Sequence, residues 1–556
     1  MTEPHFNLIV DPWLRLATPD ATVTEASIET AFRNSRDYTG LASDFAPEDA
    51  AVTRVLLAVI YRAYKDEVPD VDDLDAVIDF WESLFHAPSL WTPQVEDYLN
   101  EHKERFSLSG DAPFMLTPEL NEEGKDIFKL TDVITYVGVD QFSVSDKDTL
   151  TPAEVARAVI CAQSYDTTGV KTGVSSDPRF DKGKTYGAKL TAASWGAVTV
   201  VTGSSLHETL VLNYVPYLTR DGDLPPWEKH HPGVLPFDPL VKGERGKMVE
   251  QSVAPKGPVE SMTWQSRRIN IRWTEDGNAD AAVICSGDSL DANALYGAES
   301  MSPFYFSEAK SEELKSATYR VEALKPDREA WSKLGGFLPE ANPRTHQGEK
   351  KRWHGNRSTM PAENIKWVKT LVNEGILHST AHLRAHAVSV VYGPNNSLPI
   401  DVIQAGFPVP KSAMENDAIN DAVFAAVNAL PKVMGHISGF YKSLVLSPMS
   451  GPDMAYGDGG RADKRAVSAV FEAWLDQVGE YGGNADQAYK AWAEKTLRTV
   501  EAYADKTIST LPTRAFVSTV SDGKHIEHPM KARSTLRYRV EKALGLRKED
   551  YDQKDN

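Results

Sequence analysis

The stretch Phe407-Pro408-Val409-Pro410 divides this chain into two parts with different hydrophobic patterns. After it, apolar residues recur only at intervals of three and four, which predicts amphipathic helices. A first stripe of apolar residues runs from Ile419 to Tyr441, with Pro431 as an expected kink or break, and a second runs from Val467 to Tyr481. The pattern therefore indicates two helices in succession.

Two more helices are expected further along the chain. Asn484 can cap a third helix, because an asparagine side chain accepts a hydrogen bond from the first helical turn. Pro529 can open a fourth, since the first position of a helix needs no backbone N–H. Four stripes joined by short and medium loops predict that residues 406–556 form an antiparallel four-helix bundle.

Residues 1–405 are predicted to form a large mixed α/β domain, which makes the fold class of the whole chain α+β. Residues 48–65 carry apolar positions at helical spacing. Apolar or alternating runs predict strands at Phe6–Val10, Ala197–Val201, Leu210–Val215, Arg268–Trp273 and His386–Tyr392. Long polar stretches separate these elements at 166–189, 219–260 and 338–360, and loops of such length are usually functional or disordered.

The last of these strands leads into Tyr392-Gly393-Pro394-Asn395-Asn396-Ser397, a stiff turn that presents two amide side chains. Pro394 fixes its own φ, and glycine and asparagine tolerate conformations that most residues avoid. Short side chains that each carry a donor and an acceptor can read base edges in a groove of DNA. The same residues also make an ordinary exposed turn, and the local sequence alone favours this second interpretation.

Length and composition restrict the class of protein. A chain of 556 residues with this apolar content is a folded globular protein of two or more domains. Its two cysteines, Cys161 and Cys285, leave no room for a disulfide framework or a CxxC zinc site. The sequence shows no secretory signal at its start and no apolar run near the roughly 20 residues of a membrane helix. A soluble, cytoplasmic protein is expected.

The net charge of −19 argues against a protein that coats nucleic acid non-specifically, because phosphate attraction dominates such binding. Two local basic clusters nevertheless stand out. Residues 344–357 include Lys350, Lys351 and Arg352 with Trp353 among them, and residues 531–542 hold five basic side chains against Glu541. Each cluster is either a binding surface or a solvated charged face, and sequence alone leaves both interpretations open.

The sequence offers no catalytic motif. Gly169-Val170-Lys171-Thr172-Gly173 lacks the GxxxxGK[ST] spacing of a phosphate-binding loop, so nucleotide hydrolysis is unsupported. His378, His382 and His386 recur every four residues, which would place them along one side of a helix as potential metal ligands. No Asp, Glu or Cys at ligand spacing completes such a site, and a strand is expected to begin at His386. We expect no enzyme and no cofactor.

Seven short segments occur in a fixed order along the chain: Phe6–Leu14, Pro113-Phe114-Met115, Leu150–Glu154, Gly169–Gly173, Leu224–Glu228, Thr263–Arg268 and Val391–Ser397, followed by the bundle. Together they resemble the CasA family, the large subunit of the type I-E CRISPR surveillance complex Cascade. No single motif is specific, but their order and spacing from residue 6 to the end of the chain are. Some members carry a central cysteine cluster that this chain lacks, so no zinc is implied.

The resemblance implies a non-catalytic, DNA-binding role in antiviral defence. In this family the subunit joins other Cascade subunits and the guide RNA, recognises the protospacer-adjacent motif in double-stranded DNA and promotes strand separation. It also helps to recruit the nuclease-helicase. Guide pairing reads the remaining sequence, while protein reads the motif and the duplex shape. The family's motif contacts come largely from the minor groove, whose degenerate readout suits several related motifs.

The resemblance places the family's wedge-like turn on Asn395, Asn396 and Ser397, where the family often has glutamine. It places the family's glycine loop on Thr168, Gly169 and Lys171. Where some members have consecutive glycines, this chain has Thr167-Thr168.

Further candidates follow from the resemblance or the basic clusters. Phe142 matches the start of a loop that contacts the guide RNA and neighbouring subunits in the family, with a core aromatic as the alternative. Lys310 is a candidate for the family's lysine finger. The basic stretch with Lys350, Lys351 and Arg352 can guide duplex DNA or the displaced strand.

Two other functions stay open at this stage. One is a metal-dependent hydrolase that uses His378 and His382. The other is a scaffold that holds subunits together without touching DNA.

Overall fold

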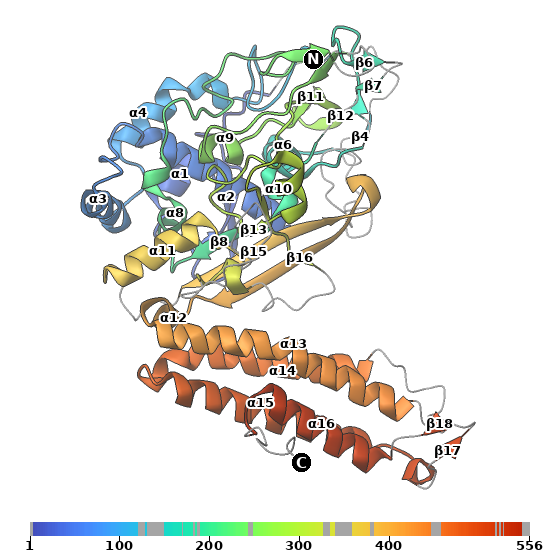
Figure 1. The fold of residues 1–556 in the computed structure, drawn as a ribbon. Helices are drawn as coiled ribbons and strands as arrows, with labels where there is room; N and C mark the ends of the chain where they lie inside the picture. The colour runs from blue at the N-terminus through green and yellow to red at the C-terminus, as the bar shows by residue number, and fades with distance from the viewer. Residues whose placement is uncertain are drawn as a thin grey trace. The chain divides into compact units, whose positions relative to one another are not determined.

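The computed structural model describes residues 4–120, 128–129, 149–169, 171–181, 184–185, 189–242, 248–325, 334–339, 359–377, 383–445, 458–516, 520–521, 524–525 and 528–547. These residues divide into two compact units. The first extends to Val409 without Leu334, and the second comprises Leu334 and the residues from Pro410 onward. The first unit mixes helices with small sheets, and the second is helical apart from one short hairpin (Figure 1). The predicted α+β fold class is confirmed.

Helix α2 (Ala46–Ala63) confirms the helix expected over residues 48–65 and is buried almost throughout. Even its polar Arg54 is enclosed, where it pairs with buried Glu299 at 2.8 Å. The other helices that the structure describes in this unit are short to medium in length. They are α1 (Ile28–Arg33), α3 (Leu74–His86), α4 (Pro93–Glu101), α6 (Pro152–Tyr165), α7 (Ala192–Trp195), α8 (Leu206–Asn213), α9 (Pro258–Met262), α10 (Glu308–Leu314) and α11 (Glu363–Asn373), with 3-10 turns η1 (Lys103–Phe106) and η3 (Pro216–Leu218).

The described strands of this unit pair antiparallel in small sheets, in the orders β2-β1-β3, β10-β9, β11-β12-β4, β13-β14, β5-β7-β6 and β16-β15-β8. Outside the last sheet, the strands are β1 (Leu14–Ala17), β2 (Val23–Ala26), β3 (Gly40–Leu41), β4 (Phe128–Lys129), β5 (Lys171–Thr172), β6 (Phe180–Asp181), β7 (Lys184–Thr185), β9 (Leu240–Lys242), β10 (Met248–Glu250), β11 (Arg267–Trp273), β12 (Ala279–Ser286), β13 (Phe304–Phe306) and β14 (Tyr319–Val321).

The sheet β16-β15-β8 carries the turn that the sequence singled out. It consists of β8 (Val198–Thr202), β15 (Arg384–Tyr392) and β16 (Pro399–Pro408). Strand β8 pairs only with residues 384–388 of β15, whereas β16 pairs along the whole of β15. The far end of the β15–β16 hairpin therefore extends beyond β8 and presents its turn, Pro394–Asn396 (η5), at the end of a two-stranded arm.

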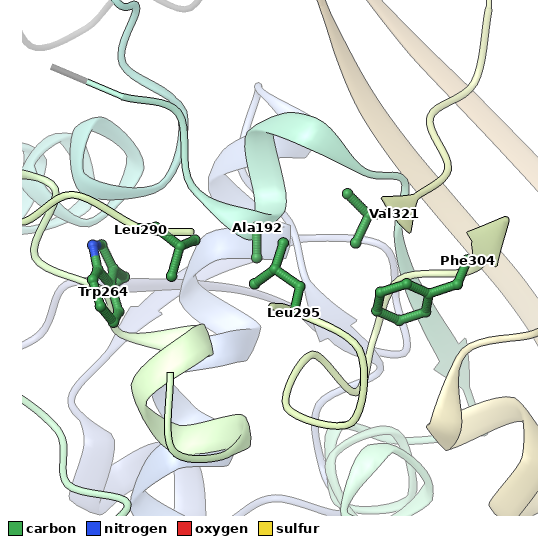
Figure 2. Close-up of a cluster of buried hydrophobic side chains, with 6 residues drawn as sticks. All are labelled: Ala192, Trp264, Leu290, Leu295, Phe304 and Val321. Carbon is green, nitrogen blue, oxygen red and sulfur yellow. The ribbon is translucent and has the colours of Figure 1, made fainter. Parts of the chain in front are cut away.

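A compact apolar cluster fixes the short helix α7 beside this sheet (Figure 2). Ala192 at the start of α7 points toward Leu295, and Trp264 and Leu290 lie on one side of the pair. Phe304 and Val321 of β13 and β14 complete the cluster on the other side. Because α7 is anchored by this burial, it can serve as a fixed support for the neighbouring hairpin.

Two predicted strands are wrong. Phe6–Val10 is not a strand, because Asn7 and Asp11 bond to each other's backbone and form a turn, with Asn7 N–H donating to Asp11 Oδ2 at 2.7 Å. Leu210–Val215 lies largely in helix α8, whose N-cap Ser205 accepts from the N–H of Glu208 at 3.2 Å. That run is apolar because α8 is buried on nearly all sides, so its hydrophobic period gave no helical signal.

The three other predicted strands are confirmed with small shifts at their ends. They are Ala197–Val201 as β8, Arg268–Trp273 as β11 and His386–Tyr392 as β15.

The second unit confirms the predicted four-helix bundle. Helix α13 packs against α14, α15 and α16, and α15 packs against α14 and α16 (Figure 1). The elements described in this unit are α12 (Lys411–Glu415), α13 (Asp417–Val445), α14 (Asp458–Gln477), η6 (Val478–Tyr481), α15 (Ala485–Ser509), η7 (Thr513–Phe516), β17 (Val520–Ser521), β18 (Lys524–His525) and α16 (Pro529–Ala543).

The helix ends of the bundle follow the sequence closely. Asn484 accepts a hydrogen bond from the N–H of Gln487 at 3.0 Å and so caps α15, and Pro529 is the first residue of α16. Helix α13 continues through Pro431, so a break at this residue is wrong. Pro431 is exposed, and water can satisfy the carbonyl that loses its partner there. No helix in the described part of the chain is long and apolar enough to span a bilayer.

Candidate nucleic-acid interface

The turn between β15 and β16 has a strained backbone. Asn395 has a φ of 56° and Asn396 a φ of 51°, both in the left-handed region. Of the non-glycine residues with positive φ in the described ranges, these two alone are adjacent. The left-handed conformation costs most L-residues roughly 1–2 kcal/mol, and asparagine adopts it more readily than most. Other contacts must therefore hold this pair.

Hydrogen bonds within the turn close it into a tight loop. Gly393 N–H donates to the carbonyl of Leu398 at 2.7 Å, and Asn396 N–H donates to the carbonyl of Gly393 at 3.0 Å. The hydroxyl of Ser397 donates to the carbonyl of Pro394 at 2.9 Å. The described part of the chain gives the amide side chains of Asn395 and Asn396 no hydrogen-bond partner. They can bond to a ligand.

The loop after α6 touches this turn directly. The N–H of Thr168 donates to the carbonyl of Asn396 at 3.0 Å. Its hydroxyl lies 2.6 Å from the carbonyl of Asn395 and 3.2 Å from that of Asn396, so the shorter contact takes most of its single hydrogen. Two segments more than 220 residues apart, both singled out from the sequence, therefore meet at one surface.

Gly169 lies beside this contact with room around it. A Cβ on Gly169 would lie 3.6 Å from Thr167 Oγ1 and 4.0 Å from the carbonyl oxygen of Ser397, which are ordinary contact distances. Packing within the chain therefore does not require a glycine here.

A buried arginine holds the Thr168 loop from beneath. Arg267 of β11 has no exposed surface, and its guanidinium donates to the carbonyl of Thr167 at 2.6 Å and to that of Asp166 at 3.1 Å. It also forms an ion pair with the Asp166 carboxylate. Gln163 of α6 accepts from the N–H of Arg267 at 2.9 Å. The loop therefore rests on the sheet β11-β12 and the end of α6.

Lys171 is directed into this cluster rather than outward. Its ammonium lies 2.7 Å from Asp166 Oδ2, and its side chain is only 10% exposed. Burial would raise the pKa of the Asp166 carboxyl, but the charges of Arg267 and Lys171 outweigh burial and hold that pKa below its usual value. Burial lowers the pKa of Lys171, with Asp166 opposing. In this structure Lys171 stabilises the loop.

The base of the hairpin is tied to the same support. The hydroxyl of Tyr392 donates to the carbonyl of Tyr165 at 2.7 Å and lies 3.1 Å from Ser194 Oγ in α7. Helix α6, which ends at Tyr165, starts with a capping box in which Thr151 and Glu154 bond reciprocally. The hairpin and the Thr168 loop therefore share one rigid base. In the sequence, Arg267 belongs only to a resembling motif, and Tyr392 only to a predicted strand and the turn that follows it, so neither residue was predicted as a support.

Two apolar side chains are exposed next to the asparagines. Leu398 is 54% exposed and Ile400 is 47% exposed. They stand two residues apart in and beside β16, so they face the same side of the strand. The end of the arm thus combines amide groups with exposed apolar surface.

Several sequence candidates lie elsewhere or outside the described residues. Lys310 of α10 pairs with Glu313 at 2.6 Å on an exposed helix face. In the C-terminal cluster, Arg533 pairs with Asp505 and Arg537 with Glu501 at 3.2 Å, so part of its charge is neutralised. Phe142, Lys350, Lys351, Arg352, His378 and His382 all lie outside the described residues.

Two other features of the described residues bear on the alternative functions, namely groups of metal-ligating side chains and a cavity. The described residues contain no group of three His, Cys, Asp or Glu side chains that could hold a metal ion. A cavity of about 470 Å³ is lined by both signs of charge, with Lys229, Asp238 and Glu260 beside Phe237 and Trp264. Lys229 and Glu260 are already paired at 2.8 Å.

Comparisons with known proteins give a consistent result. The model of a family described as CRISPR-associated protein Cse1 matches residues 7–503. A CRISPR-associated protein CasA/Cse1 of Thermus thermophilus is 29% identical over 281 residues, which are 49% of this chain and 50% of that protein. The chain thus spans about half the length of this curated relative.

Solved structures share the fold over nearly the whole chain. Cse1 of Thermobifida fusca has a TM-score of 0.80 at 24% identity, over 98% of this chain and 99% of that one. Cse1 of Acidimicrobium ferrooxidans has a TM-score of 0.76 at 20% identity, over 98% and 99%. A chain of a CRISPR RNA-guided surveillance complex has a TM-score of 0.68 at 14% identity, over 97% and 99%.

Proposed function

Because the chain belongs to the CRISPR-associated protein Cse1 family, we propose that it is a non-catalytic subunit of a type I-E RNA-guided CRISPR surveillance complex, or Cascade. In this role it recognises the protospacer-adjacent motif in double-stranded DNA and promotes strand separation. One observation carries the proposal: the hydrogen bonds from Thr168 to Asn395 and Asn396 join the two predicted DNA-contacting segments into one surface.

The chemistry of that surface suits a groove of DNA. Asn395 and Ser397 are exposed, and asparagine amides can donate to and accept from base edges. Minor-groove proteins also insert apolar side chains between base steps to unstack them. Exposed Leu398 stands beside the amides and fits this second task.

The remaining contacts extend from this surface. Gly169 leaves room for close approach of a DNA backbone. Lys171 supports this surface through its ion pair with Asp166, or it contacts DNA if that ion pair breaks. We further propose that Lys350, Lys351 and Arg352 guide duplex DNA or the displaced strand.

We also propose partners and a location for this subunit. Phe142 belongs to a segment that contacts the guide RNA and neighbouring subunits, and the subunit helps to recruit the nuclease-helicase. It works in the cytoplasm and requires no cofactor.

The test is target binding by the reconstituted complex that contains this chain. Asn395→Ala and Asn396→Ala should weaken binding to duplexes with the correct motif and leave binding to motif-free DNA within about twofold, because base contacts specify while phosphate contacts position. Asn100→Ala, at an exposed position of α4, is the matched control. If both turn variants bind the motif as the unmodified protein does, the chain is a scaffold. Stoichiometric metal in the purified protein would instead revive the hydrolase hypothesis with His378 and His382.

A further inference from the structure

Thr168 makes its contacts with the backbone of the turn and not with the asparagine side chains. Its N–H and its hydroxyl donate to the carbonyls of Asn396 and Asn395, at 3.0 and 2.6 Å. These carbonyls belong to the two residues with left-handed φ. The bonds therefore bear on the part of the turn whose conformation is least favoured.

The bonds from Thr168 fix where the two amide side chains point. A change of φ or ψ at Asn395 or Asn396 would rotate their carbonyls away from Thr168 and swing the side chains with them. Apart from the bonds to Thr168, the backbone N–H and carbonyl groups of Asn395 and Asn396 make one backbone hydrogen bond in the described part of the chain. It runs from the N–H of Asn396 to the carbonyl of Gly393 at 3.0 Å. The Thr168 hydroxyl is thus the side-chain group best placed to hold the left-handed pair.

The loop that supplies this hydroxyl is itself well held. Arg267 donates to the carbonyl of Thr167, the residue next to Thr168, at 2.6 Å. On the other side, the hydroxyl of Tyr392 bonds to the carbonyl of Tyr165 at 2.7 Å and fixes the base of the hairpin. Because both segments are held in place, the hydrogen bonds from Thr168 can restrict the movement of the turn. Between two mobile segments the same bonds would not do so.

We propose that Thr168 is a positioning residue. Its hydroxyl holds Asn395 and Asn396 in their left-handed conformations and thereby determines how well the turn discriminates between motifs. This inference rests on the proposed function, because it assigns the discrimination to the same asparagine turn. Thr168 then acts on DNA indirectly, through the two asparagines, and not by a direct contact. Pre-organised groups gain affinity by avoiding the loss of conformational freedom on binding.

The experiment compares isosteric and conservative substitutions in the reconstituted complex. Thr168→Val keeps the shape and the backbone N–H but removes the hydroxyl, while Thr168→Ser keeps the hydroxyl. Thr167→Val is the matched control, because its hydroxyl faces the Lys171 ammonium at 3.4 Å rather than the turn. Binding is measured to duplexes with the preferred motif, a permuted motif and no motif.

Thr168→Val should reduce the ratio of affinities for preferred and permuted motif about fivefold to tenfold, with motif-free binding within about twofold. Thr168→Ser and Thr167→Val should keep that ratio. If unmodified protein discriminates between the motifs and Thr168→Val does so equally well, the positioning role of Thr168 is refuted while the proposed function stands. If unmodified protein shows no discrimination, the proposed function itself fails. Thr168→Ala, judged by the same ratio, replaces the valine variant if that variant does not fold.

Discussion

Gly169→Ala is a substitution for which folding and DNA binding should respond in opposite directions. The added Cβ would meet Thr167 Oγ1 at 3.6 Å and the carbonyl of Ser397 at 4.0 Å, so nothing in the chain must move. The φ of Gly169 is not in the left-handed region, and alanine can adopt it without strain. The fold therefore accepts the methyl group.

The expected magnitudes follow from these distances. Replacing glycine by alanine at a compatible position stabilises a protein by about 0.4–1 kcal/mol, because the unfolded chain loses freedom. If a DNA backbone passes over Gly169, the methyl group displaces it and removes at least one hydrogen bond to a charged phosphate. Such a bond contributes about 1.5–3 kcal/mol, so the affinity of the complex for target DNA should fall about tenfold or more.

Two measurements check this prediction, namely the free energy of unfolding in urea and the affinity of the reconstituted complex for target duplex. Gly40→Ala in β3, where a Cβ would meet nothing within 4 Å, is the matched control and should leave binding unchanged. Gly257→Ala should destabilise, since its Cβ would clash with the Asp223 carboxylate. Unchanged affinity of Gly169→Ala would refute the close approach of DNA, and a clear loss of stability would refute the packing argument.

Two further predictions concern the support of the site and the pH dependence of folding. Arg267→Ala should lower the free energy of unfolding by about 3–5 kcal/mol, because it removes a fully buried guanidinium from two backbone carbonyls and takes one charge partner from the largely buried Asp166. Arg272→Ala, at a more exposed pair on the same strand, should cost under about 1 kcal/mol. Urea unfolding checks both, and similar costs would reject the role of burial. Burial raises the pKa of Glu48 in α2 to about 7, against the partial opposition of Arg157. A raised carboxyl pKa contributes stability that is complete below about pH 4.5 and is lost as pH rises through about 7. Glu48→Gln should therefore flatten the melting-temperature profile between pH 4.5 and 8, and parallel profiles of variant and unmodified protein would contradict this.

The sequence predicted most of the second unit because its signals are local. Helical stripes, the cap at Asn484 and the proline at 529 each act within a few residues, and the structure confirms them. The strands Phe6–Val10 and Leu210–Val215 were wrong for a related reason. In the first, side chains of Asn7 and Asp11 bond locally in place of a ladder, and in the second, burial on nearly all sides erases the helical period.

The site could be predicted only in pieces. The asparagine turn and the glycine loop were each visible, but their contact depends on two hydrogen bonds across more than 220 residues. The role of Arg267 was hidden for the same reason, since an arginine in a strand gives no local sign that it will be fully buried. The charge of Lys171 was expected to face DNA, but in the structure its ammonium pairs with the largely buried carboxylate of Asp166, five residues earlier in the chain.

The backbone conformation of the turn accounts for asparagine at positions 395 and 396. The resembling family often has glutamine in this turn, and a shorter asparagine would reach less far into a groove. The conformations of Asn395 and Asn396, at φ of 56° and 51°, favour asparagine, whose short amide tolerates the left-handed region better than a longer side chain does. Replacing either asparagine by glutamine should then weaken the turn through its backbone even though the reach of the amide increases.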